Sequence, residues 1–133
     1  MDYYQHDLAL VHDRGYGHHA DRCAPGILAL LAPDAPVLEL GCGSGALTRH
    51  LLAAGHQVIA TDASEAMLER ARAALGGGAD LRRLALPDDP LPAADAIVSV
   101  GHVISYLADA AAVGRALAAM KPVRNWGLCC WRG

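Results

Sequence analysis

The 133-residue chain contains no phenylalanine, and aromatic residues make up only 5% of it. Hydrophobic residues, mostly alanine and leucine, supply 53% and charged residues 19%, which excludes an intrinsically disordered chain. No apolar run reaches the roughly 18 residues that a membrane-spanning helix needs. The formal net charge of −3 shows no excess of positive charge that would attract nucleic acid or an anionic membrane. We therefore expect a globular domain with neither nucleic acid nor a membrane as its partner.

Cysteine is sparse and shows no motif. The chain has four, at Cys23, Cys42, Cys129 and Cys130. Without CxxC spacing they predict neither a metal site nor a disulfide framework. The first residues also lack the basic and apolar regions of a secretion signal. A reducing cytoplasm is the simplest interpretation, and no metal site is predicted.

From residue 36 onward, apolar segments of strand length alternate with amphipathic segments of helix length. The expected strands are residues 37–40, 57–61, 80–84 and 96–100, and the expected helices are residues 45–54, 64–75 and 109–120. This alternation predicts right-handed crossovers and a mainly parallel sheet in a three-layer α/β/α sandwich. Ligands bind at the carboxyl ends of the strands in such sheets. We expect the functional site at that edge.

The segments that flank this pattern differ from it. Residues 1–35 are expected to form one or two helices over the sheet, the first interrupted near Gly15 and Gly17 and the second starting at Pro25. They would act as a partial cover for a core at residues 36–122. Residues 123–133 form an atypical tail in which a fifth strand would be a weak edge at best. The whole is interpreted as one domain.

A glycine-rich turn follows the first expected strand. Gly41, Gly43 and Gly45 allow a sharp turn and the close approach of a ligand. The helix start behind them suits a carboxylate or a phosphate. With Ala46 the turn also fits the dinucleotide fingerprint G-x-G-x-x-G/A, and Asp62 after the second strand suits a ribose in either case. These residues alone leave a nicotinamide dinucleotide and another nucleoside cofactor both open.

Glu39, two residues before the first glycine, favours one of these ligands. A carboxylate there would repel a pyrophosphate, whereas it would attract an amino group or a sulfonium. The sequence therefore favours a cationic, zwitterionic cofactor that carries a nucleoside.

Four segments together resemble the class I S-adenosylmethionine-dependent methyltransferases, which have a Rossmann-like fold. Residues 37–45 resemble motif I, residues 58–68 the second motif, residues 95–107 the fourth strand with its loop, and residues 116–122 the helix before the fifth strand. The resemblance covers residues 36–122. It implies transfer of a methyl group from S-adenosylmethionine, leaving S-adenosylhomocysteine.

The resemblance also implies a set of cofactor contacts, in order from the methionine end through the ribose to the adenine. They are Glu39, Gly41, Cys42, Gly43 and Gly45 for the methionine end, Asp62 for the ribose, Ala63 and Met67 near the adenosine, Ala85 and Leu86 along the adenine, and the backbone of Gly101. Met67 fits the hydrophobic core equally well.

The acceptor is expected to be a small molecule, because the Asn-Pro-Pro-aromatic motif of amino-methylating nucleic-acid enzymes is absent after the fourth strand. His102, directly after that strand, is the candidate general base, although a structural histidine would fit there too. The alternatives are a nicotinamide-dependent oxidoreductase and a non-catalytic remnant that only binds cofactor.

The tail departs from the family pattern, which continues after Lys-Pro with a Gly-Gly turn, a fifth strand and an antiparallel hairpin. Residues 123–125 stand in place of that turn, and the sequence ends eight residues later. This predicts a truncated or frame-shifted domain, incomplete at its C-terminal end. The fourth strand would then lie at an exposed sheet edge, where a homodimer could form.

Overall fold

The computed structural model describes residues 6–100, 107–123 and 125–129. In chain order the elements are α1 (His6–Leu30), β1 (Val37–Leu40), α2 (Thr48–Ala53), β2 (Val58–Asp62), α3 (Glu65–Leu75), β3 (Asp80–Arg83), β4 (Ala96–Val100), α4 (Ala110–Met120) and β5 (Asn125–Cys129). The strands form one parallel sheet in the order β3-β2-β1-β4-β5. The predicted fold class is confirmed.

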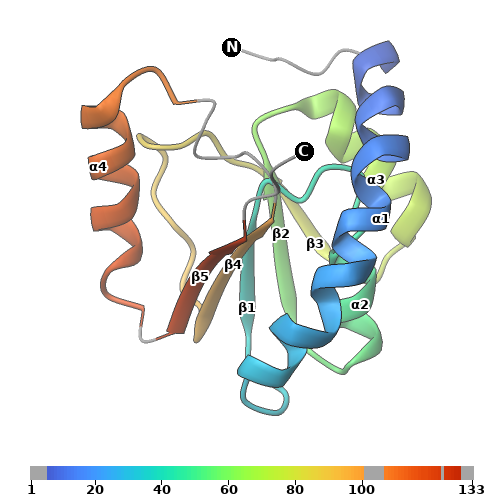
Figure 1. Ribbon diagram of the computed structural model, residues 1–133, viewed down its shortest axis with the longest axis horizontal. Helices are drawn as coiled ribbons and strands as arrows, with labels where there is room; N and C mark the ends of the chain where they lie inside the picture. Colours follow the sequence, from blue (N-terminus) through green and yellow to red (C-terminus); the bar gives the residue numbers. More distant parts are fainter. Residues whose placement is uncertain (1–5, 101–106, 124, 130–133) are drawn as a thin grey trace.

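The order of the strands places a switch point beside β1. The chain runs from β1 outward through β2 to β3, and then returns to the other side of β1 as β4 (Figure 1). The carboxyl ends of all five strands lie at the same edge of the sheet, at the top in Figure 1. Crevices that bind ligands in open α/β sheets form at this kind of point.

The alternation of side chains along β1 builds two hydrophobic layers. Leu38 and Leu40 face α4 and pack with Ile97 and Met120. Val37, one residue earlier, faces the other helices and joins a larger cluster with residues of α1 and α2. The helices α1, α2 and α3 cover this second face, and α4 lies alone on the first (Figure 1). The central strands β1 and β4 are therefore buried on both sides, which is usual for parallel sheets, whereas the edge strand β3 is mostly exposed.

The N-terminal region forms one helix, so the expected break near Gly17 is wrong. The helix α1 also continues through Pro25, where a new helix was expected to start. Local propensity opposes this, because a glycine costs about 1 kcal/mol and an internal proline about 3 kcal/mol in a helix. The burial of Ala20 and Ala24 against the core cluster offsets that cost, since both are almost fully shielded from solvent.

The structure also corrects the expected start of α2 and the expected weakness of the fifth strand. The helix α2 begins at Thr48 and not at Gly45, because Gly45 has a φ of +91°, which an α-helix does not allow. The tail forms a full strand: β5 pairs with β4 over five register positions, from Ala96 with Asn125 to Val100 with Cys129. Within the described residues β5, and not β4, is the outer strand on this side.

Candidate cofactor site at the carboxyl edge of the sheet

The glycine turn leaves β1 at the carboxyl edge and leads into α2. Its three glycines all have positive φ angles, 71° at Gly41, 56° at Gly43 and 91° at Gly45. Side chains with a Cβ rarely adopt such angles, so this path of the backbone depends on glycine. The amide of Cys42 donates to the carbonyl of Thr61 at 2.8 Å, which ties the start of the turn to β2.

The last glycine of the turn also has a packing role. A Cβ placed on Gly45 would lie 2.8 Å from Cδ1 of Leu75, at the end of α3. The absence of a side chain at Gly45 therefore lets α3 pack closely under the turn. Gly45 therefore has a packing role in addition to any role in binding.

Asp62 bridges the turns that follow β1 and β2. Its Oδ2 accepts a hydrogen bond from the amide of Gly43 at 2.9 Å, and its Oδ1 accepts one from the amide of Ser64 at 2.8 Å. Ser64 is the N-cap of α3, and its hydroxyl accepts from the amide of Met67 at 3.3 Å. The half-buried carboxylate of Asp62 thus lies directly beside the glycine turn.

Glu39 carries a second carboxyl group at the same edge. Its side chain is only 2% exposed, and its Oε1 accepts a 2.5 Å hydrogen bond from the hydroxyl of Thr48 at the start of α2. Burial raises the pKa of Glu39 to about 7, the Thr48 hydrogen bond opposes that rise, and repulsion from Asp62 adds to it. Near neutral pH this carboxyl is therefore poised between its neutral and charged forms.

The remaining walls come from the turn itself and from the loop after β3. Cys42 is buried, and burial raises the pKa of its thiol well above the ordinary value. The amide of Ala85 donates to Asp89 at 2.8 Å, and the amide of Asp89 donates back to the carbonyl of Ala85 at 3.1 Å. These bonds hold the loop that contains Leu86 compact at the carboxyl edge. The neutral thiol of Cys42 donates to the carbonyl of Gly43 at 3.5 Å within the turn.

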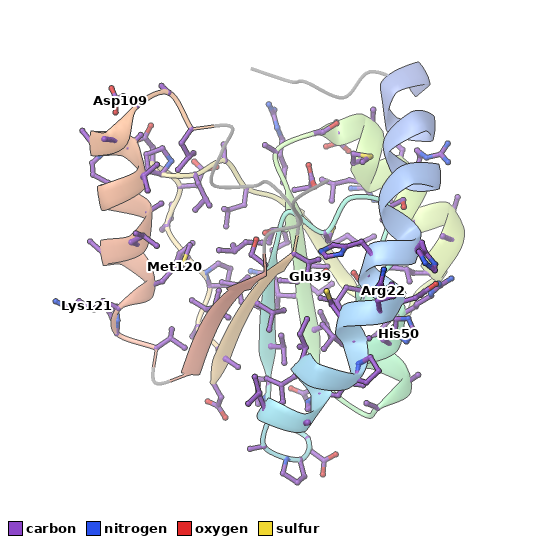
Figure 2. All side chains as sticks on the ribbon, in the orientation of Figure 1. Arg22, Glu39, His50, Asp109, Met120 and Lys121 are labelled. Atoms are coloured by element: carbon purple, nitrogen blue, oxygen red, sulfur yellow. The ribbon has the colours of Figure 1, made fainter. Side chains whose placement is uncertain are left out.

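The structure brings most of the predicted residues to this edge and leaves some outside the described part. Glu39 lies near the end of β1 and Asp62 ends β2, and the glycine turn and Ala85 come directly after the carboxyl ends of β1 and β3 (Figure 1). Figure 2 labels Glu39 within the sheet. The side chain of Met67 is 1% exposed, which matches its core interpretation. Gly101 and His102 lie outside the described residues.

Two threonines were missed by the sequence analysis, although both contact Glu39. Thr48 donates to its carboxyl group, and Thr61 donates to its backbone carbonyl at 2.8 Å. Both are completely buried. The neighbouring polar residues, Arg49 and His50 after Thr48 and Asp62 after Thr61, gave no local signal that these two hydroxyl groups are buried. Over the described residues, no group of three or more metal-ligating side chains comes together.

The comparisons with known proteins decide the family. A model of the methyltransferase domain matches residues 37–123, which contain β1, the glycine turn and every element through α4. The chain belongs to the methyltransferase domain family. Its members use S-adenosylmethionine, which confirms the cofactor class that Glu39 favoured over a nicotinamide dinucleotide.

Individual relatives agree with this family assignment. The ubiquinone biosynthesis O-methyltransferase of Bordetella pertussis is 33% identical over 95 residues, which are 68% of this chain and 39% of that protein. The S-adenosylmethionine-bound structure of CalS10, an amino pentose methyltransferase from Micromonospora echinaspora, has a TM-score of 0.71 at 28% identity over 98% of this chain and 58% of its own. Streptomyces venezuelae DesVI has a TM-score of 0.70 at 28% identity, covering 90% and 54%.

The chain thus spans between about two fifths and three fifths of the length of these relatives. The strands β1 to β4 lie within the residues that the family model matches. Among the described helices, none is long and apolar enough to cross a lipid bilayer.

Proposed function

We propose that this chain binds S-adenosylmethionine at the carboxyl edge of β1 and β2 and transfers its methyl group to a small-molecule acceptor. The proposal rests on two carboxyl groups next to the glycine turn. Glu39 lies in β1 just before the turn, and Asp62, at the end of β2, accepts a hydrogen bond from the turn. The two acids make the site electronegative, which suits a ligand that carries an ammonium and a sulfonium.

The same geometry disfavours a dinucleotide. A pyrophosphate binds to free amides of a glycine turn, whereas the Gly43 amide already donates to Asp62. A phosphate near that amide would also approach a carboxylate directly. This supports the methyl-donor cofactor over the nicotinamide alternative.

We further propose that the cofactor contacts follow the family pattern along this edge. The methionine end would lie on the glycine turn against Glu39, and the ribose would share the remaining lone pairs of the Asp62 carboxylate, with Ala63 and Leu86 toward the adenosine. The Nε of Arg83 donates to the carbonyl of Ala63 at 3.2 Å, which supports a fixed loop at that position. The complete proposed set is Glu39, Gly41, Cys42, Gly43, Gly45, Asp62, Ala63, Met67, Ala85, Leu86 and Gly101.

The chemistry asked of the protein is mainly alignment. The bound cofactor supplies an electrophilic methyl group on its sulfonium. The chain has to hold that methyl in line with an acceptor oxygen or nitrogen and exclude water, and such positioning contributes several kcal/mol to a two-substrate reaction. We propose His102 as the general base that accepts the proton of the acceptor group.

The acceptor class rests on the relatives. The B. pertussis relative acts in ubiquinone biosynthesis and CalS10 acts on an amino pentose, and both names point to small molecules. The spacing of the cysteines supports a cytoplasmic setting for the reaction. The position of β5 as the outermost described strand supports a homodimer that forms through its outer edge.

Titration calorimetry and turnover test these proposals separately. We expect S-adenosylhomocysteine to bind and NAD not to bind. NAD binding without S-adenosylhomocysteine binding would contradict the cofactor assignment. A screen of quinol, amino-sugar and phenolic acceptors with methyl-labelled S-adenosylmethionine then tests the transfer. Binding without turnover on any acceptor would favour the non-catalytic alternative, and light scattering at several concentrations would show whether a dimer forms.

A further inference from the structure

The hydrogen bond between Thr48 and Glu39 joins two elements on either side of the glycine turn. Glu39 lies in β1 before the turn, and Thr48 is the first residue of α2 after it. Both side chains are buried, at 2% and 0% exposure, and the bond between them is 2.5 Å long. A buried carboxyl group whose geometry is set by one short hydrogen bond is held in a defined orientation.

Among the described residues, the surroundings of Glu39 supply negative charge and no cation paired with it. On the neighbouring strands its register partners are Ala60 and Val98, and α1 contributes Ala20 and Ala24 to the cluster on this face. The titratable group that acts on it is the Asp62 carboxylate, and Glu39 in turn helps to raise the pKa of the Cys42 thiol. Within the described part of the chain, no lysine, arginine or histidine forms an ion pair with Glu39.

We propose that Thr48 is the positioning residue of Glu39, and that binding of the cationic cofactor displaces a proton which the Glu39 carboxyl carries in the free protein. This inference rests on the proposed function, because it assigns the displaced proton to the same cofactor site. The Thr48 hydroxyl fixes Oε1 and leaves Oε2 for a donor from the ligand. The O–H bond of the carboxyl group breaks, its proton leaves to solvent, and the carboxylate pairs with the ammonium group of the ligand.

The geometry and the electrostatics agree on this exchange. An uncompensated buried carboxyl next to another carboxylate prefers its neutral form, and the pKa of Glu39 is raised to about 7 accordingly. A cation placed against it reverses that preference. Affinity for the cofactor should therefore rise with pH until Glu39 is ionised in the free protein, by up to about tenfold per pH unit below the pKa.

The first measurement is calorimetry with S-adenosylhomocysteine, whose amino group is the relevant cation, in two buffers of different ionisation enthalpy. We expect release of nearly one proton at about pH 6 and almost none at about pH 8. Glu39→Gln should abolish both the proton release and the pH dependence of affinity between these values.

Thr48→Val and Thr48→Ser isolate the positioning role. Removing the hydroxyl removes the interaction that lowers the pKa of Glu39, so the midpoint of the affinity profile should move to higher pH. Serine should restore it. Thr61→Val is the matched control, because Thr61 is equally buried but donates to the backbone carbonyl of Glu39. It should cost stability and leave the midpoint unchanged.

Carbon-13 NMR titration of the Glu39 carboxyl in the free protein reports on Thr48 without any ligand. A midpoint near 7 that rises in Thr48→Val and returns in Thr48→Ser would support the positioning role. A midpoint that does not move in Thr48→Val would overturn it. Binding of S-adenosylhomocysteine without proton release would overturn the exchange alone, whereas no binding at any pH would contradict the proposed function and the exchange together.

Discussion

The carboxylate of Asp62 accepts the amide of Gly43 at 2.9 Å across nineteen residues of sequence. This bond fastens the turn after β1 to the end of β2, so the residue proposed to bind the ribose also shapes the glycine turn. If Asp62 binds the ribose as proposed, binding and folding are coupled at this residue. A change there acts on both.

For Asp62→Ala we expect loss of both functions. The amides of Gly43 and Ser64 would lose their acceptor, at a cost of about 1–3 kcal/mol for each group left unsatisfied. Affinity for S-adenosylhomocysteine should fall by at least roughly tenfold, as expected for a lost charged hydrogen bond. Urea unfolding and calorimetry measure the two effects. Asp80→Asn, at the start of β3, is the control: it weakens only an exposed ion pair with Arg82, so it should cost no more than about 1 kcal/mol and leave the affinity unchanged. An Asp62→Ala variant as stable as the wild type would contradict the bridge.

Two glycines with different surroundings allow a paired prediction. Gly45→Ala should destabilise the fold by about 1–3 kcal/mol, because its φ of +91° is unfavourable for alanine and its Cβ would lie 2.8 Å from Leu75. Gly114→Ala, in α4, should stabilise the fold by about 0.5–1 kcal/mol, because a Cβ there meets nothing within 4 Å. Thermal unfolding compares the two. Equal effects of both changes would exclude a special role for Gly45.

The strands of the core could be predicted from sequence because their residues must be buried on both faces. The apolar runs at residues 37–40 and 96–100 coincide with β1 and β4. Helix was predicted in residues 1–35, but the continuity of α1 was not, since glycine and proline argue locally against a helix that packing against α2 and α3 stabilises. The strand β5 was underestimated for the related reason that its pairing with β4 is a long-range contact.

In the candidate site, too, local patterns could be predicted from the sequence and long-range contacts could not. Glycines at alternate positions and an acid after the second strand are local patterns, so they placed the turn and Asp62 correctly at the carboxyl edge. The contact from Thr48 to Glu39 depends on how α2 returns over β1, which no spacing in the sequence specifies. The roles of these residues toward a cofactor stay predictions.

Pro25 gives a prediction about the helix that covers the core. Proline inside α1 leaves the carbonyl four residues earlier without its helical donor. Pro25→Ala should restore that hydrogen bond and stabilise the fold by roughly 1–3 kcal/mol. Part of this gain is offset, because proline restricts the unfolded chain and alanine does not. Gly26→Ala, with nothing within 4 Å of its Cβ, is the matched change and should give up to about 1 kcal/mol. Destabilisation by Pro25→Ala in urea unfolding would contradict a continuous helix.

Glu39 makes the stability of the fold depend on pH in a direction opposite to that of most carboxyl groups. The pKa of Glu39 is about 7 in the folded protein and 4.5 in its ordinary, unfolded setting. Between pH 4.5 and about 7 the folded state therefore binds a proton that the unfolded state has lost. The contribution to stability is therefore complete below about pH 4.5 and is lost as the pH rises to about 7, amounting to about 3 kcal/mol. Glu39→Gln should remove this slope and make the variant the more stable protein at about pH 8. The difference between wild-type and variant unfolding free energies, measured across this range, isolates Glu39 from the histidines, and a flat difference would show that Glu39 is ionised throughout.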